Sequence, residues 1–228
     1  MVYPSVLDQE RTENLGMLVD ATESFMSTEN NADQNDRNAK IDPAVWEAAK
    51  PMGSFGLLVP EEYEGMACNN TEFARLTEIM LAEDAGFSIA IGAHQSIGYK
   101  AILLLGNESQ KRQYLPDLAT GRKIAAFALT EPAVGSDAAS VQTKAVLSDD
   151  GKHYILNGSK IWISNGGIAD VFTVFAKVPE KQADGSIKEK MSAFIVERKH
   201  GVKSGPPEDK MGIKASNTAE VYFLGFEK

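Results

Sequence analysis

The chain has 228 residues, 43% of them hydrophobic and 24% charged, which is enough to bury the core of one or two domains. Its net charge of -9 argues against nucleic acid as the main partner, because phosphate contacts need clustered Lys and Arg. The single cysteine, Cys68, excludes an intramolecular disulfide, and no Cys/His cluster has the spacing of metal ligands, so a reducing compartment is favoured.

The first half of the chain shows helical periodicity. One face of the first predicted helix carries Leu15, Leu18, Val19, Thr22 and Phe25. Further helices are expected to begin at Asp42–Pro43, near Asn70 and Thr71, and at Asn107, where Gln110 completes a capping box. The polar run 28–40 is expected to be a loop. The apolar stretch 86–106 is interrupted by polar residues, which predicts a buried helix rather than a membrane span.

The second half of the chain changes to a period of two. Strands are expected at 142–147, 153–156, 160–164, 171–178, 191–198 and 218–223. Asp150–Gly151 and Asn157–Gly158 separate the first three, and such pairs readily adopt the positive φ angles of tight hairpin turns. The sequence therefore predicts an α + β fold, with an all-helical domain over residues 1–121 and an antiparallel β-barrel or sandwich domain over residues 122–228.

Two segments of the β half contain residue types suited to binding a flat ring. They are FALTEPAVGSD at 127–137 and NGSKIWISNG at 157–166. Each alone is as well explained by a strand leading into a turn and by a core tryptophan. Together they could bind an isoalloxazine ring, which needs an apolar wall and hydrogen-bond donors along one edge. Trp162 would be the wall, and Thr130, Ser164 and the N–H groups of the 131–136 turn would be donors that favour the reduced ring.

From about Leu15 to Tyr222 the chain resembles the acyl-CoA dehydrogenases, and the two segments above resemble the flavin-binding signatures of that family. Several further segments resemble its very-long-chain branch: GAHQSIG at 92–98, SDAAS at 136–140, SNGGIADVFTVFAK at 164–177 and KMGIKASNTAEV at 210–221. The resemblance implies the N-terminal helical and middle β domains of a three-domain, homodimeric flavoprotein, with the C-terminal helical domain absent from this chain.

The resemblance also implies a cofactor and the residues that bind it. The cofactor is FAD, and the residues expected along one edge of it or beside its ring are Phe127, Ala128, Leu129, Thr130, Glu131, Gly135, Ser136, Trp162, Ile163 and Ser164. Ser136 is also expected to contact the fatty acyl-CoA substrate. No metal is expected, and no membrane contact is expected for this chain.

The reaction implied by the resemblance is the α,β-dehydrogenation of a long- or very-long-chain fatty acyl-CoA to the trans-2-enoyl-CoA, the first step of mitochondrial β-oxidation. A carboxylate removes the α proton, a hydride passes to the flavin, and an electron-transfer flavoprotein reoxidises it. The family's base is a glutamate of the C-terminal domain, so no catalytic residue is assigned here and the chain is expected to be inactive alone. The full-length enzyme is expected on the matrix side of the inner mitochondrial membrane.

Several residues allow both a structural and a functional interpretation. The acids Glu61, Glu62, Glu131 and Asp137 are expected to be caps and solvated loop residues, with Glu131 shaping its turn. His94 could shuttle a proton, but a helix-packing role is favoured. Lys210 and Lys214 could meet an anionic group, but a solvated position is favoured. An acyl tunnel or core packing would explain equally well the apolar residues Phe55, Leu57, Leu58 and Val59. The second functional hypothesis is a non-catalytic binding or assembly module of the same family, which a bound flavin and a nearby glutamate base would argue against.

Overall fold

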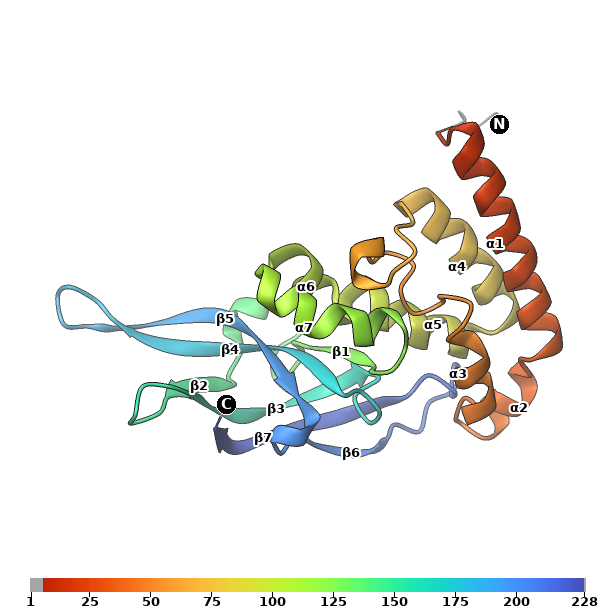
Figure 1. Cartoon of the computed structure of the whole chain (residues 1–228). Helices are drawn as coiled ribbons and strands as arrows, with labels where there is room; N and C mark the ends of the chain where they lie inside the picture. Colours follow the sequence, from red (N-terminus) through yellow and green to blue (C-terminus); the bar gives the residue numbers. More distant parts are fainter. Residues whose placement is uncertain (1–5, 228) are drawn as a thin grey trace.

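A computed structural model describes residues 6–227, with the helices in the first half of the chain and the strands in the second (Figure 1). The helices are α1 (Gln9–Thr28), α2 (Ala32–Arg37), α3 (Pro43–Ala49), α4 (Asn70–Glu83), α5 (Ala85–Ala93), α6 (Lys100–Leu105) and α7 (Glu108–Ala119). The short turns are η1 (Glu61–Tyr63), η2 (His94–Gly98), η3 (Ala138–Ser140) and η4 (Arg198–His200). The strands are β1 (Ala125–Ala128), β2 (Lys144–Leu147), β3 (Tyr154–Ser164), β4 (Val171–Lys181), β5 (Ile187–Glu197), β6 (Lys203–Pro207) and β7 (Thr218–Glu227).

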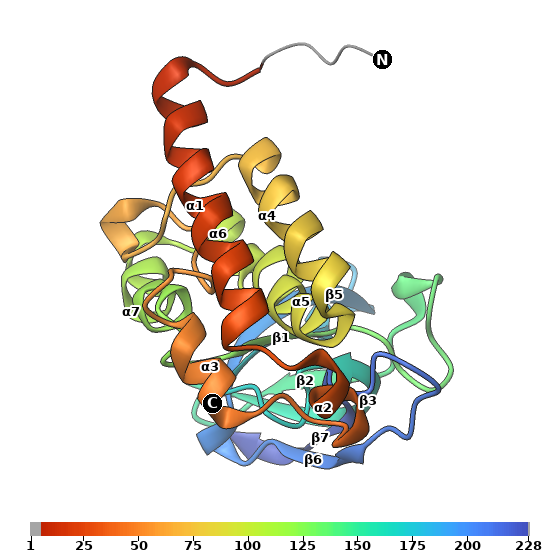
Figure 2. The same cartoon turned by 90° about the vertical axis from the view of Figure 1, so that its right-hand side faces the viewer.

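Except for α6, the α-helices begin at a side chain that accepts a hydrogen bond from a backbone N–H of the first turn. Asp42, the residue before Pro43, accepts a hydrogen bond from the Ala44 N–H at the start of α3. Capping boxes at Asn69 and Asn107 start α4 and α7. These starting points agree with the predicted ones. In Figure 2, α1 and α4 lie side by side, with the strands below them.

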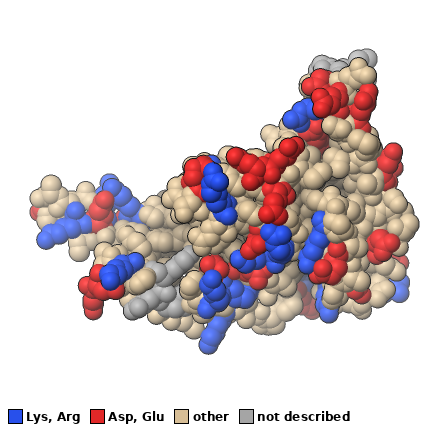
Figure 3. Space-filling model, viewed as in Figure 1, with Lys and Arg blue, Asp and Glu red and all other residues tan. Residues whose placement is uncertain are grey.

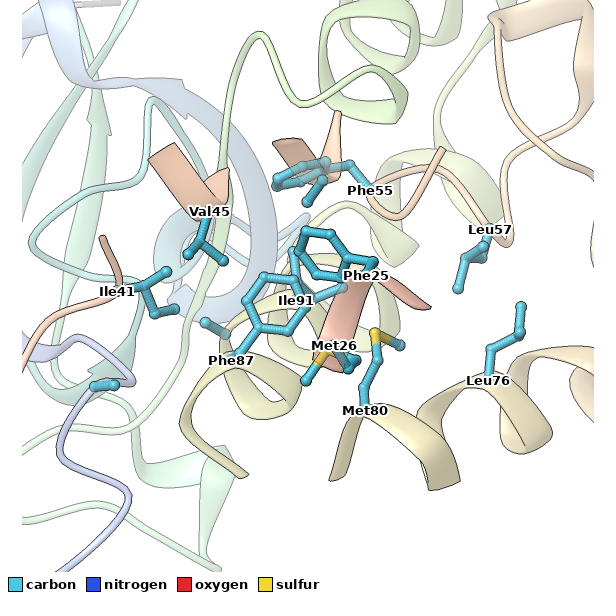
Figure 4. Packing of buried hydrophobic residues seen from close by; sticks show 13 residues of the cluster. Phe25, Met26, Ile41, Val45, Phe55, Leu57, Leu76, Met80, Phe87 and Ile91 are labelled. Atoms are coloured by element: carbon cyan, nitrogen blue, oxygen red, sulfur yellow. The ribbon is translucent and has the colours of Figure 1, made fainter. Parts of the chain in front are cut away.

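The helices share an aromatic and aliphatic core. Phe25 of α1 and Phe87 of α5 lie 5.6 Å apart between ring centroids, and Ile91 points toward both (Figure 4). The predicted apolar face of α1 is confirmed by Phe25, and Phe55, Leu57 and Val59 are buried as core residues. Burial of these side chains holds the helices together.

The polar run 28–40, predicted to be a loop, contains the short helix α2. Asn31 caps that helix by accepting from the Gln34 N–H. Asn35 is buried, donates to the Asp84 carboxylate at 3.0 Å and accepts from the Asp42 N–H at 3.1 Å. Tertiary partners of a polar side chain, rather than an apolar face, therefore order this segment.

The apolar stretch 86–106, predicted to be one buried helix, is divided into α5, the π-helical turn η2 and α6. The backbone passes close to β1 at Gly98, where an added Cβ would lie 2.9 Å from the Ala125 Cβ. The Gly98 carbonyl accepts a hydrogen bond from the Thr173 hydroxyl on β4 at 3.0 Å. This irregular turn fastens the helical half to the sheet.

The strands form one mixed sheet in the order β1-β4-β2-β3-β7-β6, with β5 pairing with the other edge of β4. The predicted β domain is confirmed; most of its pairs are antiparallel, but β4 pairs with β1 and with β2 in parallel. On β4, the pairing with β1 ends at Val174 and the pairing with β2 is at Lys177. The two short strands therefore share one edge of β4, with a gap between them. The chain from 129 to 143 leaves and re-enters the sheet at this gap.

The Asp150–Gly151 pair forms the predicted tight turn, with Gly151 at φ 68°. The prediction of a second turn at Asn157–Gly158 is wrong, because β3 continues through both residues with a bulge in its pairing with β7. Gly158 has φ 157°, and a Cβ there would lie 2.3 Å from the Thr143 Oγ1. The glycine is needed for this close approach and this backbone conformation, not for a chain reversal.

Within residues 6–227, no helix is long and apolar enough to cross a membrane, and no group of His, Cys, Asp and Glu is arranged to hold a metal ion. On the face shown in Figure 3, basic and acidic side chains are interspersed.

Candidate flavin site

The two signature segments lie against each other at the gap between β1 and β2. The Ile161 N–H donates to the Thr130 carbonyl at 3.0 Å. The Lys160 ammonium donates to the Leu129 carbonyl at 3.1 Å and to the Glu131 carboxylate at 2.8 Å. Contacts between residues 29 to 31 positions apart in the sequence therefore hold the two segments together.

Trp162 stands out from the sheet instead of packing inside it. The pairing of β3 with β7 is irregular between Lys160 and Ile163, and Trp162 has φ 56°. A positive φ in a bulky residue is a strained conformation that the surrounding structure must maintain. The side chain is 65% exposed, so the core interpretation of this tryptophan is excluded and an indole face is open to a ligand.

Hydrogen-bond donors line the 130–136 loop. Within residues 6–227, no group is bonded to the Thr130 N–H or hydroxyl, or to the N–H groups of Gly135 and Ser136. Not every N–H of the turn is available, however, because those of Glu131 and Val134 donate to each other's carbonyls at 3.0 Å. Apart from its two neighbours in the chain, no described residue has an atom within 4 Å of a Cβ built on Gly135, so a ligand could approach the backbone there.

The remaining residues of the predicted set divide by the direction of their side chains. Ala128 and Ile163 are buried in the sheet core, and Glu131 is buried beneath the loop, so they can offer a ligand only backbone atoms. Phe127 is half-buried against Phe175, with ring centroids 4.9 Å apart. Ser136 is exposed, and Leu129 and Ser164 are partly exposed.

The end of β3 is held by Asn165, which the sequence reasoning did not single out. Asn165 is fully buried with φ 61°, and its backbone N–H donates to the Asn217 carbonyl at 2.7 Å. Its amide donates to the Ala90 carbonyl of α5 at 2.9 Å. The sequence did contain a signal for irregular backbone in this region, namely Asn–Gly at 157–158 and Asn–Gly–Gly at 165–167, because Asn and Gly tolerate left-handed conformations. Ser164 is thus positioned from both the sheet and the helices.

The expectation that Glu131 is solvated is wrong. Its carboxylate is 4% exposed and accepts hydrogen bonds from the Gln142 N–H at 2.6 Å, the Thr143 N–H at 2.9 Å, the Thr143 hydroxyl at 2.5 Å and Lys160. Burial raises the pKa of Glu131, but these donors outweigh it and hold the pKa below its ordinary value. The expectation that Glu131 shapes its turn agrees with these contacts. Lys160, its fully buried partner, was missed.

Two other candidates, His94 and Lys210, have structural roles. His94 is fully buried; its Nδ1 accepts from the Ala125 N–H at 2.8 Å, so its Nε2 carries the proton and donates to the Leu118 carbonyl at 2.9 Å. Both ring nitrogens are used, as the helix-packing interpretation predicts. The expectation that Lys210 is solvated is wrong, because its ammonium donates to the Ile213 and Ser216 carbonyls at 2.7 and 2.5 Å.

The other acids lie at the surface. Glu61 and Glu62 are exposed in η1, and exposed Asp137 accepts a hydrogen bond from the Ser140 hydroxyl.

Cys68 is only partly buried, and burial raises the pKa of its thiol to about 11. Lys214 is half-buried, and its backbone N–H donates to the Asp36 carboxylate at 2.9 Å.

The donor set fits an isoalloxazine ring. An exposed indole face, the N–H and hydroxyl of Thr130, and the partly exposed Ser164 are brought together by the contact between Thr130 and Ile161. An apolar wall beside neutral donors suits a flat ring with apolar faces and a polar edge.

Comparison with known proteins agrees with this chemistry. Residues 12–122 match the family model "Acyl-CoA dehydrogenase, N-terminal domain", and residues 126–225 match "Acyl-CoA dehydrogenase, middle domain". The chain is 55% identical over 225 residues to the mitochondrial very long-chain specific acyl-CoA dehydrogenase of Homo sapiens, covering 98% of this chain and 34% of that protein. It thus spans about a third of the length of the very-long-chain relatives it matches.

Solved structures that share the fold include two acyl-CoA dehydrogenases. An acyl-CoA dehydrogenase complexed with FAD from Bacillus anthracis is 39% identical with a TM-score of 0.83, over 99% of this chain and 37% of that one. Butyryl-CoA dehydrogenase from Megasphaera elsdenii is 32% identical with a TM-score of 0.84, over all of this chain and 58% of that one. Sequence, fold and family models agree, and the chain belongs to the acyl-CoA dehydrogenase family.

Proposed function

We propose that this chain forms the FAD- and acyl-CoA-binding part of a dehydrogenase that converts long- or very-long-chain fatty acyl-CoA to trans-2-enoyl-CoA. The observation that carries the proposal is the hydrogen bond from the Ile161 N–H to the Thr130 carbonyl, which joins the strand that carries the exposed Trp162 to the loop whose Thr130 donors have no partner within residues 6–227. The 55% identity to a very-long-chain dehydrogenase supports the chain-length class.

The proposal assigns a role to each part of the site. Residues 1–121 form the helical domain, and residues 122–228 bind flavin and substrate. Backbone atoms from Phe127 to Glu131, with Gly135 and Ser136, border the ring edge, while Trp162, Ile163 and Ser164 lie beside the ring. Ser136, which is exposed, also contacts the acyl-CoA. Bound FAD supplies the hydride acceptor, and the donors of this chain favour its reduced form.

None of the carboxylates near the site is proposed as the base that removes the α proton. Glu131 has its oxygens occupied by Lys160 and Thr143, and a base must be within hydrogen-bond reach of the proton it takes. Asp137 is exposed and bonded to Ser140. The base is therefore proposed to come from outside the two signature segments.

The setting of this activity is proposed from the relatives. The chain is 55% and 56% identical to the mitochondrial very long-chain specific acyl-CoA dehydrogenases of Homo sapiens and Bos taurus, which supports our placing the protein in mitochondria, on the matrix side of the inner membrane. Its electron acceptor is proposed to be an electron-transfer flavoprotein, and its assembly a homodimer.

The test is the visible absorption spectrum of the purified protein with FAD, followed by anaerobic titration with palmitoyl-CoA. Binding of FAD with a perturbed spectrum is expected, and absence of FAD binding would overturn the proposal. Bleaching by palmitoyl-CoA would show dehydrogenation and place the base among the residues of this chain. Bound FAD that does not respond to any acyl-CoA would favour the non-catalytic binding module.

A further inference from the structure

We propose that the buried pair Lys160–Glu131 is a positioning device that turns the peptide between Leu129 and Thr130 toward the flavin. This inference rests on the proposed function, since it needs FAD at the site. It concerns residues that lie behind the loop and do not themselves face a ligand, because the side chains of Lys160 and Glu131 are 0% and 4% exposed.

Lys160 fills the gap that β1 and β2 leave along β4. The Phe175 carbonyl lies between the last residue of β4 paired with β1, Val174, and the residue paired with β2, Lys177. With no strand opposite, this carbonyl accepts instead from the Lys160 ammonium at 2.7 Å. A buried carbonyl without a partner would be costly, so the ammonium replaces the missing strand.

The same ammonium fixes the direction of one peptide plane. An ammonium has three N–H donors, and here they meet three acceptors: the Phe175 carbonyl, the Leu129 carbonyl and the Glu131 carboxylate. In a trans peptide the C=O and the following N–H point in opposite directions. Because the Leu129 carbonyl points inward to Lys160, the Thr130 N–H points outward, where it has no partner within residues 6–227.

Glu131 secures the other end of the loop. Its carboxylate receives the Gln142 and Thr143 N–H groups, where the chain returns to the sheet, and it neutralises the buried ammonium. One carboxylate therefore ties the departure and the return of the 129–143 segment to the same point. A donor held in this way is oriented before the flavin binds and needs no rearrangement on binding.

The test compares flavin-loaded wild type with two double variants that each remove one Lys and one Glu. Lys160→Met/Glu131→Gln removes the buried pair without leaving an unpaired charge. Lys190→Met/Glu180→Gln removes an exposed pair on β4 and β5, far from the signature segments, and is the matched control. Circular dichroism checks folding, flavin fluorescence gives the Kd for FAD, and spectroelectrochemistry gives the midpoint potential of the bound flavin.

The expected result is a Kd for FAD at least tenfold higher in the buried-pair variant and a more negative midpoint potential, because the Thr130 N–H no longer stabilises the reduced ring. The control should stay within twofold of wild type. A folded buried-pair variant with wild-type Kd and potential would overturn the inference while leaving the proposed function intact. Failure of the wild type to bind FAD would overturn the proposed function itself.

A milder variant keeps the test decisive if the double variant does not fold. Thr143→Val removes only the hydroxyl that donates to Glu131 at 2.5 Å. A smaller shift of the midpoint potential in the same negative direction is expected. An unchanged potential in this variant would contradict the positioning role.

Discussion

Buried polar side chains hold loops in both halves of this protein, and two of their clusters, one in each half, differ in charge. The helical polar cluster is His94, Gln95 and Tyr99, in which Gln95 accepts from the Leu57 N–H at 2.8 Å and donates to the Ser54 carbonyl at 2.9 Å. The sheet polar cluster is Glu131, Thr143 and Lys160.

The difference between the clusters follows from the groups they must satisfy. In the helical polar cluster each polar atom of Gln95 and His94 forms a hydrogen bond with a single backbone group, so neutral amide and imidazole groups suffice. The sheet polar cluster must satisfy two carbonyls on one side and two N–H groups on the other, which a cation and an anion do together. A buried charge is tolerated only when it is paired and fully bonded, so the sheet polar cluster is the more vulnerable to losing a single member.

The largest effect is expected from Lys160→Met alone. It leaves the Glu131 carboxylate buried without its cation, which should lower the free energy of unfolding by about 3–5 kcal/mol. Urea denaturation of the single variant and of Lys160→Met/Glu131→Gln measures this. The double variant should recover much of the loss, and equal losses in both would show that the charge imbalance is not what matters.

A smaller loss is expected when the sheet polar cluster is disturbed without changing a charge. In Gly158→Ala the new Cβ meets the Thr143 hydroxyl, and φ at 158 is 157°, so the free energy of unfolding should fall by up to about 3 kcal/mol. Gly212→Ala is the matched control, because within the part of the chain that the structure describes only its two neighbours have atoms that could lie within 4 Å of a Cβ there. Equal stability of the two variants in urea would contradict the close approach of β3 to Thr143.

The helical polar cluster should respond to pH rather than to charge removal. Burial lowers the pKa of His94 to about 4, below the 6.5 of an exposed histidine. The unfolded chain therefore binds more protons between these values, and stability is present above about pH 6.5 and lost as the pH falls toward 4. The expected loss from this residue is about 2 kcal/mol between pH 7 and pH 5.

The measurement is urea denaturation at both pH values for wild type and His94→Gln. The variant removes the titrating group, so the difference between the two slopes isolates His94 from the carboxylates. Parallel pH dependences would show that His94 is not kept neutral by the fold.

What the sequence could predict depends on how far the partners of a residue lie along the chain. The capping box Asn107–Gln110 and the turn Asp150–Gly151 involve residues within a few positions, and both predictions agree with the structure. The Lys160–Glu131 pair spans 29 positions and depends on a gap between two strands, which periodicity does not reveal. For this reason the sequence suggests a solvated Glu131 and gives no prediction for Lys160.

The errors at Asn157–Gly158 and over 86–106 have a common cause. Each pattern has two local solutions, a turn or a bulge for Asn–Gly and a continuous or interrupted helix for an apolar stretch. Contacts from elsewhere decide between them: Thr143 packs on Gly158, and Ala125 packs on Gly98. The family resemblance predicts a set of candidate residues, and the structure separates those that are exposed, such as Trp162, from those buried in the core, such as Ile163.

The smallest effect on stability is expected outside both clusters, at Trp162. Since its side chain is 65% exposed, Trp162→Ala should change the free energy of unfolding by no more than about 0.5 kcal/mol, where a packed core tryptophan would cost several times more. FAD binding should nevertheless weaken roughly tenfold, because the indole face is lost as a wall for the ring. Ile187→Ala, at a similarly exposed position on β5, is the control and should change neither quantity. A large loss of stability with unchanged FAD affinity would return Trp162 to the core and remove it from the flavin site.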